Sequence, residues 1–140
     1  LAQTGVSLLE VLIALVVLTI GLLGMAALQT NALQNNQSSF LRTQAVIMSY
    51  YALDAMRVDY DNAVDGDYDL NKTCQPPVSG TTLASKFHHD WVQSLQDNLG
   101  TGACGAINCA SADCVVQVWW AEGRATGGQA EQELQTGAKL

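Results

Sequence analysis

The chain has 140 residues, of which 13 are acidic and six are basic, so its net charge is −7. The basic residues are scattered, which argues against a nucleic-acid-binding protein, because such a protein needs a basic surface for the phosphates. Apolar residues make up 49% of the chain but are concentrated near its start, a distribution that favours one small domain attached to an apolar anchor.

The first segment is apolar enough to cross a membrane. From residue 11 to residue 28 an aliphatic run is interrupted only by small or weakly polar residues, namely Thr19, Gly21 and Gly24. As a helix this run would span about 27 Å, close to the hydrocarbon thickness of a bilayer, and it is too long for an ordinary secretory signal. We therefore expect residues 6–28 to form a transmembrane or filament-core helix.

Glu10 and the two glycines are unusual in such a helix. A carboxylate in a bilayer costs about 2.5–3.5 kcal/mol at a helix centre and less near an interface. Glu10 therefore either lies at the lipid headgroups or finds a cationic partner when the segment leaves the lipid. Gly21 and Gly24 each weaken a helix by about 1 kcal/mol relative to alanine, and they either allow close helix packing or let the helix bend.

The helical pattern continues through residues 29–62, where neither proline nor glycine occurs. We expect one helix from about Ser7 to Asp61, whose second half is amphipathic. Its apolar face is predicted to hold three sets of residues: Leu33, Phe40 and Ile47; Leu41, Met48 and Ala55; Ala45, Ala52 and Met56. Its polar face is predicted to hold Gln34, Asn35, Gln37, Ser38, Arg42, Ser49 and Asp59.

Residues 63–140 are expected to form a globular head that begins with a loop. The stretch 61–82 is rich in Asp, Gly and Pro, a composition typical of loops. A calcium-binding loop is the alternative interpretation, but the EF-hand spacing fails at Ala63 and Lys72 when it is counted from Asp61. A solvated acidic loop is the simpler interpretation.

A short amphipathic helix is predicted next, with Ser85 as N-cap and Gly100 after its end. Its apolar residues recur at every fourth position: Phe87, Trp91, Leu95 and Leu99. Neighbouring residues on a helix point about 100° apart, so His88 and His89 do not share a ligand face. We expect His88-His89-Asp90 to be a solvated polar face rather than a metal or general-base site.

The stretch CVVQVWWAE, which starts at Cys114, predicts a β-strand with Val116, Val118 and Trp120 on one face. We expect Trp120 in the core and Trp119 either covered by a loop or exposed as a contact residue. The stretch ACGAINCA (103–110) is the predicted hairpin partner. The final stretch QAEQELQTGAKL forms either an edge strand or a loose tail.

The four cysteines, at positions 74, 104, 109 and 114, favour disulfides and an oxidising compartment. A zinc site is the alternative, but no C-x-x-C pair occurs. The predicted hairpin would let Cys109 bond to Cys114 across its turn, which leaves Cys74 with Cys104. Three connectivities exist for four cysteines, and the sequence does not choose among them.

The N-terminal stretch GVSLLEVLIALVVLTIGLLGMAALQ (5–29) resembles the processing and assembly signal of type IV prepilins. In that family a peptidase cuts after a Gly, the new N-terminus is methylated, and a Glu follows four residues later. The stretch is most similar to the PilV-type minor pilins, in which SLLEVLVAL is followed by IGLLG, and ALDAMRVDYDNA (52–63) resembles their ADRMRAN stretch. The resemblance implies a leader remnant at 1–5, a cut after Gly5, methylation of Val6, and pairing of Glu10 with the amine of Val6 on the same or a neighbouring subunit.

Two residues depart from the family pattern. Val6 stands where Phe is usual, and the chain lacks the mid-helix proline of major pilins. Because methylation acts on the backbone amine, we expect it to survive the first change.

The resemblance implies an α+β pilin fold: a long N-terminal helix packed on a small antiparallel sheet, with a short extra helix. It implies a minor pilin without enzymatic activity, cofactor or metal, held in the bacterial inner membrane with a periplasmic head and later incorporated into the extracellular pilus. There it would prime assembly at the tip and support adhesion and twitching motility. The implied partners are minor and major pilins, the prepilin peptidase, the inner-membrane assembly platform, membrane lipid and a tip adhesin, with no direct contact to nucleic acid.

Three alternatives remain open. The first is a minor pseudopilin of a type II secretion system, which shares the signal and the fold. The second is a single-pass membrane enzyme or zinc protein that uses the four cysteines. The third is a DNA-uptake pilin, against which the acidic balance argues.

Overall fold

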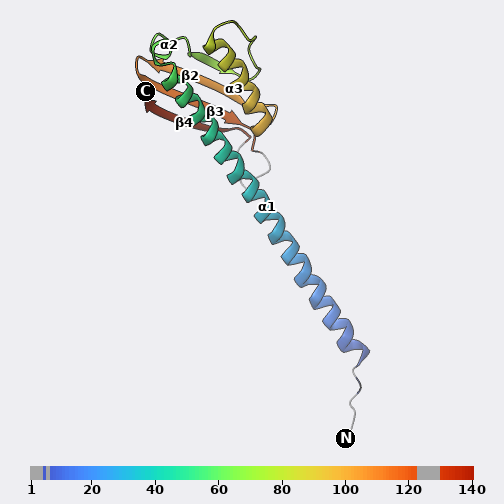
Figure 1. The fold of residues 1–140 in the computed structure, drawn as a ribbon. Helices are drawn as coiled ribbons and strands as arrows, with labels where there is room; N and C mark the ends of the chain where they lie inside the picture. The colour runs from blue at the N-terminus through green and yellow to red at the C-terminus, as the bar shows by residue number, and fades with distance from the viewer. Residues whose placement is uncertain (1–4, 6, 123–129) are drawn as a thin grey trace.

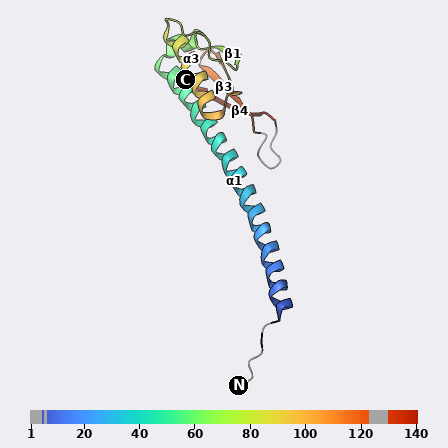
Figure 2. The same ribbon diagram turned by 90° about the vertical axis from the view of Figure 1, so that its right-hand side faces the viewer.

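The computed structural model of the protein describes residues 5, 7–122 and 130–140. A long N-terminal helix, α1, packs by its C-terminal end on a four-stranded antiparallel sheet, together with a shorter helix, α3 (Figure 1). The rest of α1 projects from this head as a stalk, and a view turned by 90° shows the same separation (Figure 2). The α+β class with a long helix, a small antiparallel sheet and a short extra helix is therefore confirmed.

Helix α1 covers Leu8–Val58, a length of 51 residues. It begins at the N-cap Ser7, whose hydroxyl accepts a hydrogen bond from the Leu9 amide at 3.3 Å. The helix ends at Val58, three residues before the approximate end predicted near Asp61, because the backbone leaves the helical region at Asp59 and restarts as the short helix α2, Tyr60–Val64. The Asp59 carboxylate accepts hydrogen bonds from Asn62 Nδ2 at 2.7 Å and from the Tyr68 hydroxyl at 3.1 Å. Such short-range side-chain bonds compete with continued helix.

The sheet has the order β1-β2-β3-β4, so each strand pairs with its neighbours in sequence. Its strands are β1 Leu70–Thr73, β2 Cys104–Ala110, β3 Asp113–Trp120 and β4 Gln132–Lys139. The predicted hairpin of β2 and β3 is confirmed, and the final stretch forms an edge strand rather than a loose tail. The prediction of loop throughout 61–82 is wrong at residues 61–64, which belong to α2, and at β1. There Asp69 Oδ1 accepts a hydrogen bond from the Cys109 amide at 2.8 Å, which holds the start of β1 beside β2.

The core lies between the inner face of the sheet and the two helices α1 and α3, Leu83–Leu99. Strand β3 alternates as predicted, with Val116, Val118 and Trp120 buried. The predicted apolar positions of α3 are buried as well, although its N-cap is Thr82 rather than Ser85. Helix α3 approaches β2 closely at Gly105, where a Cβ atom would lie 2.5 Å from the Trp91 ring.

The face that α1 buries is only partly the predicted one. Its fully buried residues are Ala45, Ser49, Ala52, Leu53 and Met56, and most of them are small, which lets the head approach the helix. Ser49 was expected on the polar face, but its hydroxyl is buried and donates to Ala45 O at 2.9 Å. The expected row of Leu33, Phe40 and Ile47 is exposed instead, because the head covers only the end of α1 and contacts another side of it.

Candidate functional site

The stalk presents a continuous apolar surface that no other described residue covers. In the most apolar window of α1 the mean hydropathy is 2.8 and 0% of the residues are buried. By length and composition this is the one helix in the described residues that could cross a membrane. Water-soluble monomers rarely expose so large an apolar surface, so it indicates contact with lipid or with other protein.

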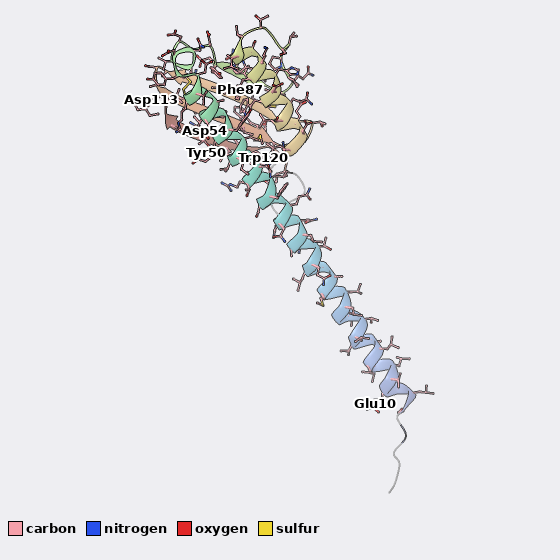
Figure 3. The ribbon with its side chains drawn as sticks, viewed as in Figure 1. Glu10, Tyr50, Asp54, Phe87, Asp113 and Trp120 are labelled. Atoms are coloured by element: carbon pink, nitrogen blue, oxygen red, sulfur yellow. A yellow bond between two sulfur atoms is a disulfide. The ribbon has the colours of Figure 1, made fainter. Side chains whose placement is uncertain are left out.

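Glu10 lies in the first turn of α1, at the end of the stalk farthest from the head (Figure 3). A carboxylate in this position interacts favourably with the helix dipole. Within the described residues the ion pairs are Arg57–Asp54 and Lys72–Glu131, so no cation of that part of the chain pairs with Glu10. Its charge is left for a partner outside the described residues or for solvent.

The predicted processing position lies immediately before the helix. Gly5 is exposed, belongs to no helix or strand, and has open space around its Cα. Val6, the predicted methylated residue, lies outside the described residues. The peptide around Gly5 thus precedes the Ser7 cap, where regular hydrogen bonding begins.

Gly21 and Gly24 lie within α1, which runs through both without a break. A Cβ atom built at either position meets nothing within 4 Å. No contact with another described residue therefore explains these two glycines. A role in packing against other helices and a role in bending both remain compatible with their positions.

Exposed apolar residues continue along α1 from the stalk to the head. We call Leu33, Phe40 and Ile47 the α1 row; their exposed fractions are 70%, 58% and 48%. Residues seven apart lie on nearly the same side of a helix, so the row forms one stripe. Tyr50 and Tyr51 extend the apolar surface onto the head, with 53% of each exposed.

The four cysteines form two disulfides, Cys74–Cys104 and Cys109–Cys114. Cys109–Cys114 closes the β2–β3 hairpin, where the two residues are direct cross-strand partners. Cys74–Cys104 joins the segment after β1 to the start of β2. Because all four sulfurs are bonded in pairs, they do not supply the thiolates that a zinc site requires.

Two acidic residues near the predicted acidic loop form hydrogen bonds that stabilise the fold. Asp59 ends α1, and Asp69 binds the Cys109 amide. Within the described residues, no group of three or more His, Cys, Asp and Glu side chains is placed to hold a metal ion. Burial beside the Asp59 carboxylate raises the pKa of Tyr68 from 10.0 to about 12, since the tyrosinate would lie next to another negative charge.

His88 was expected on a solvated polar face, but it is buried. Its Nε2 lies 3.0 Å from Tyr68 O, while His89 Nδ1 lies 2.7 Å from Pro77 O. The two rings therefore bind two different backbone segments around α3, and only Asp90 of the three is exposed. Tyr68 precedes β1 and Pro77 follows it, and the carbonyl groups of both segments need hydrogen-bond partners.

Trp119 lies opposite the core, on the other face of β3 from the buried Trp120. It is half-buried on the outer face of the sheet, where Lys72 Nζ lies 4.4 Å from its ring centroid. Reasoning from sequence missed Lys72 as its neighbour, because it missed strand β1. The alternation of β3 was the available signal, since it placed Trp119 opposite the core.

Compared with protein-family models, with curated proteins and with solved structures, the chain gives no match.

Proposed function

We propose that the chain is a minor pilin, processed after Gly5 and incorporated into a type IV pilus. The observation that carries the proposal is the combination of an uncovered apolar stalk with Glu10 at its free end and a disulfide-bonded head at its other end. A membrane anchor alone needs the apolar run, but it needs neither the carboxylate nor the α1 row.

In this proposal the stalk exchanges one apolar environment for another. In the inner membrane, lipid covers residues 8–28. In the filament, the stalks of neighbouring pilins cover them, and the α1 row extends the contact toward the head. The exchange keeps the same apolar surface out of water, so it requires no large change in the fold.

Glu10 determines how the subunit docks. Its carboxylate pairs with the methylated amine of Val6, on the same or a neighbouring subunit. Burying a carboxylate among apolar groups is costly unless a cation pairs with it. Docking is therefore favoured where the amine lies within reach of the acid.

Within the pilus, the proposed role is to prime assembly at the tip together with other minor pilins, and so to support adhesion and twitching motility. The proposed contacts are the prepilin peptidase, the assembly platform of the inner membrane, minor and major pilins, and an adhesin at the tip. The head would lie in the periplasm before assembly and outside the cell afterwards.

A minor pseudopilin of a type II secretion system is the second candidate, since the same stalk and head would serve a short periplasmic filament. The IGLLGMAAL stretch favours the pilus. Fractionation separates the two: a pilin is recovered in filaments sheared from the cell surface, and a pseudopilin stays with the cell envelope.

Mass spectrometry of the N-terminus of the protein isolated from cells tests the proposal. We expect a chain that begins at Val6 with a methylated amine. A Gly5→Leu variant serves as the control, because it should retain residues 1–5. If the membrane-bound wild-type protein also retains residues 1–5, the assembly signal is not used and the proposal is wrong.

A further inference from the structure

The outer face of the sheet, opposite α1 and α3, holds a shallow depression of about 480 Å³. Side chains from all four strands line it, among them Asn71, Ala106, Asn108, Gln117, Trp119 and Gln135. We call it the Trp119 depression. Its volume falls in the range of about 300–1,000 Å³ that is usual for small-molecule sites.

The register of the strands explains the hollow. Gln117 is the direct partner of Ala106 on one side and of Gln135 on the other, so the short Ala106 side chain lies low in that row. The large side chain of Trp119, two residues further along β3, forms one side of the depression. The register between β1 and β2 is irregular between Leu70 and Thr73, and a bulge of this kind frees strand residues from one-to-one pairing.

Each strand contributes one carboxamide to the depression: Asn71, Asn108, Gln117 and Gln135. The Gln117 amide donates to Glu133 Oε1 at 3.0 Å, which fixes its orientation and leaves its carbonyl oxygen as an acceptor. The side-chain amides of the other three make no hydrogen bond to any described residue. A carboxamide offers two donor hydrogens and an accepting oxygen, so the depression can both donate and accept at several points.

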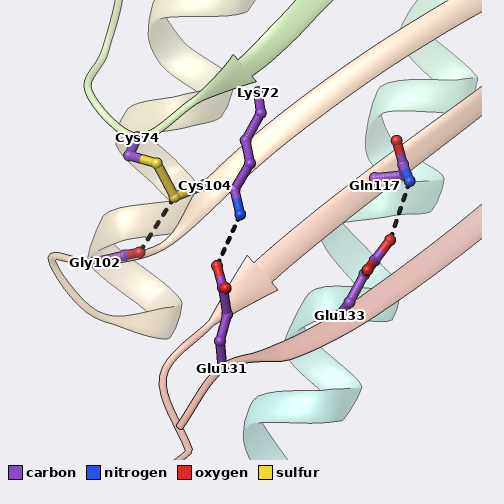
Figure 4. Close-up of polar contacts among 7 residues, drawn as sticks. All are labelled: Lys72, Cys74, Gly102, Cys104, Gln117, Glu131 and Glu133. Atoms are coloured by element: carbon purple, nitrogen blue, oxygen red, sulfur yellow. Dashed lines mark hydrogen bonds and ion pairs between the residues drawn. A yellow bond between two sulfur atoms is a disulfide. The ribbon is translucent and has the colours of Figure 1, made fainter.

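The depression holds a paired ammonium group and has a carboxylate at its edge. Lys72 is the one charged side chain in the described lining, and its Nζ lies 2.8 Å from Glu131 Oε1 (Figure 4). The same ammonium group lies over the Trp119 ring, a cation–π contact that holds the indole in place. The Glu133 carboxylate, which accepts a hydrogen bond from Gln117 at 3.0 Å, adds a negative charge at the edge of the depression.

We propose that the Trp119 depression binds a neutral saccharide. Sugar hydroxyls donate and accept hydrogen bonds, as the four carboxamides do, and the C–H face of a sugar ring is apolar enough to pack on the indole. The paired ammonium of Lys72 and the Glu133 carboxylate at the edge disfavour an anionic ligand. The four carboxamides favour a ligand with several hydroxyl groups over a simple cation. This inference does not depend on the proposed function.

The test uses the full chain in a detergent without a sugar headgroup. Trp91 and Trp120 are buried, at 0% and 2% exposure, so acrylamide quenching of tryptophan fluorescence reports mainly on Trp119. The probes are neutral tetrasaccharides of glucose, mannose and N-acetylglucosamine, with a heparin tetrasaccharide as the anionic comparison. We expect at least one neutral probe to protect Trp119, with a dissociation constant on the order of 1 mM, because the site is shallow.

An Asn108→Ala/Gln135→Ala double variant should weaken that binding by about tenfold, since two hydrogen bonds are lost. Gln93→Ala, which removes an exposed carboxamide on α3, is the matched control and should bind as the wild type does. The proposal is overturned if no neutral probe protects Trp119, if only the heparin probe does, or if the double variant and the control bind equally well.

Discussion

Trp91 donates its indole N–H to the backbone carbonyl of Met48, 3.0 Å away. The bond joins α3 to α1 at the point where the stalk meets the head. The same indole ring covers Gly105 of β2. One side chain therefore connects both helices and the sheet, and it is fully buried.

Replacing Trp91 tests this connection. Trp91→Phe keeps an aromatic ring but removes the donor, and we expect a loss of about 1–3 kcal/mol from the hydrogen bond and the smaller ring. Trp91→Ala should cost about 3–5 kcal/mol. Urea unfolding followed by circular dichroism measures both, and equal losses in the two variants would contradict the role of the ring.

Gly105→Ala should destabilise the head from the sheet side of the same contact. The new Cβ would lie 2.5 Å and 2.6 Å from Trp91 ring atoms and 2.8 Å from Leu95 Cδ1, and overpacking of this kind costs about 1–3 kcal/mol. Gly102→Ala is the control, because its Cβ meets nothing within 4 Å. Thermal unfolding should separate the two variants, and a stable Gly105→Ala protein would show that Trp91 can move aside.

The two disulfides should contribute unequally to stability. Cys74–Cys104 spans 30 positions and Cys109–Cys114 spans five, so loop-closure entropy predicts contributions of about 3.6 and about 2 kcal/mol. The Cys74→Ala/Cys104→Ala and Cys109→Ala/Cys114→Ala pairs can be compared by urea unfolding without reductant. A larger loss from the hairpin pair would mean that strand registry outweighs the chain entropy.

The stability of the head should fall at alkaline pH through Tyr68. Its pKa rises from 10.0 to about 12 on folding, so the folded state favours the neutral phenol. This contribution is complete below pH 10 and is lost as the pH rises toward 12. Tyr68→Phe should flatten the decline of the urea midpoint over that window, whereas Tyr60→Phe, at an exposed position, should leave the decline in place.

Glu10→Ala should separate membrane insertion from assembly. Removing the carboxylate leaves the apolar run intact, so we expect the variant in the membrane fraction at wild-type levels. It should be absent from filaments sheared from the cell surface. Glu133→Ala, which removes an exposed acid from the head, is the control and should be incorporated; normal incorporation of Glu10→Ala would contradict the docking role.

Much of the fold could be predicted from residue patterns within short segments of the sequence. The apolar period of α3 and the alternation of β3 each lie within a short segment, so Phe87, Trp91, Val118 and Trp120 could be placed in the core from sequence. The β2–β3 hairpin followed from two adjacent strand patterns. These features depend on residues that are close in sequence, so the periodicity of apolar residues predicts them directly.

Other features depend on contacts between distant residues and could not be predicted. Strand β1 is short and polar, and it pairs with β2, to which Asp69 also bonds through the amide of Cys109, 40 positions away. The buried side of α1 was predicted wrongly because this helix carries several apolar rows. Which row is buried depends on how the head packs against the helix, and the sequence pattern does not show this. His88 was misjudged because its hydrogen-bond partner, Tyr68, lies on another segment.

The attachment of the head to the stalk has a mechanical consequence. Among the described residues, the hydrogen bond between α1 and the head that lies nearest to the N-terminus joins Ser38 to Glu122. From Ser38 to Glu10 the unsupported helix is about 42 Å long, so a 5° tilt at the head displaces the Glu10 end by about 4 Å, more than the length of a hydrogen bond. The stalk is thus a lever arm, and the angle at which the head is held sets where the Glu10 carboxylate lies.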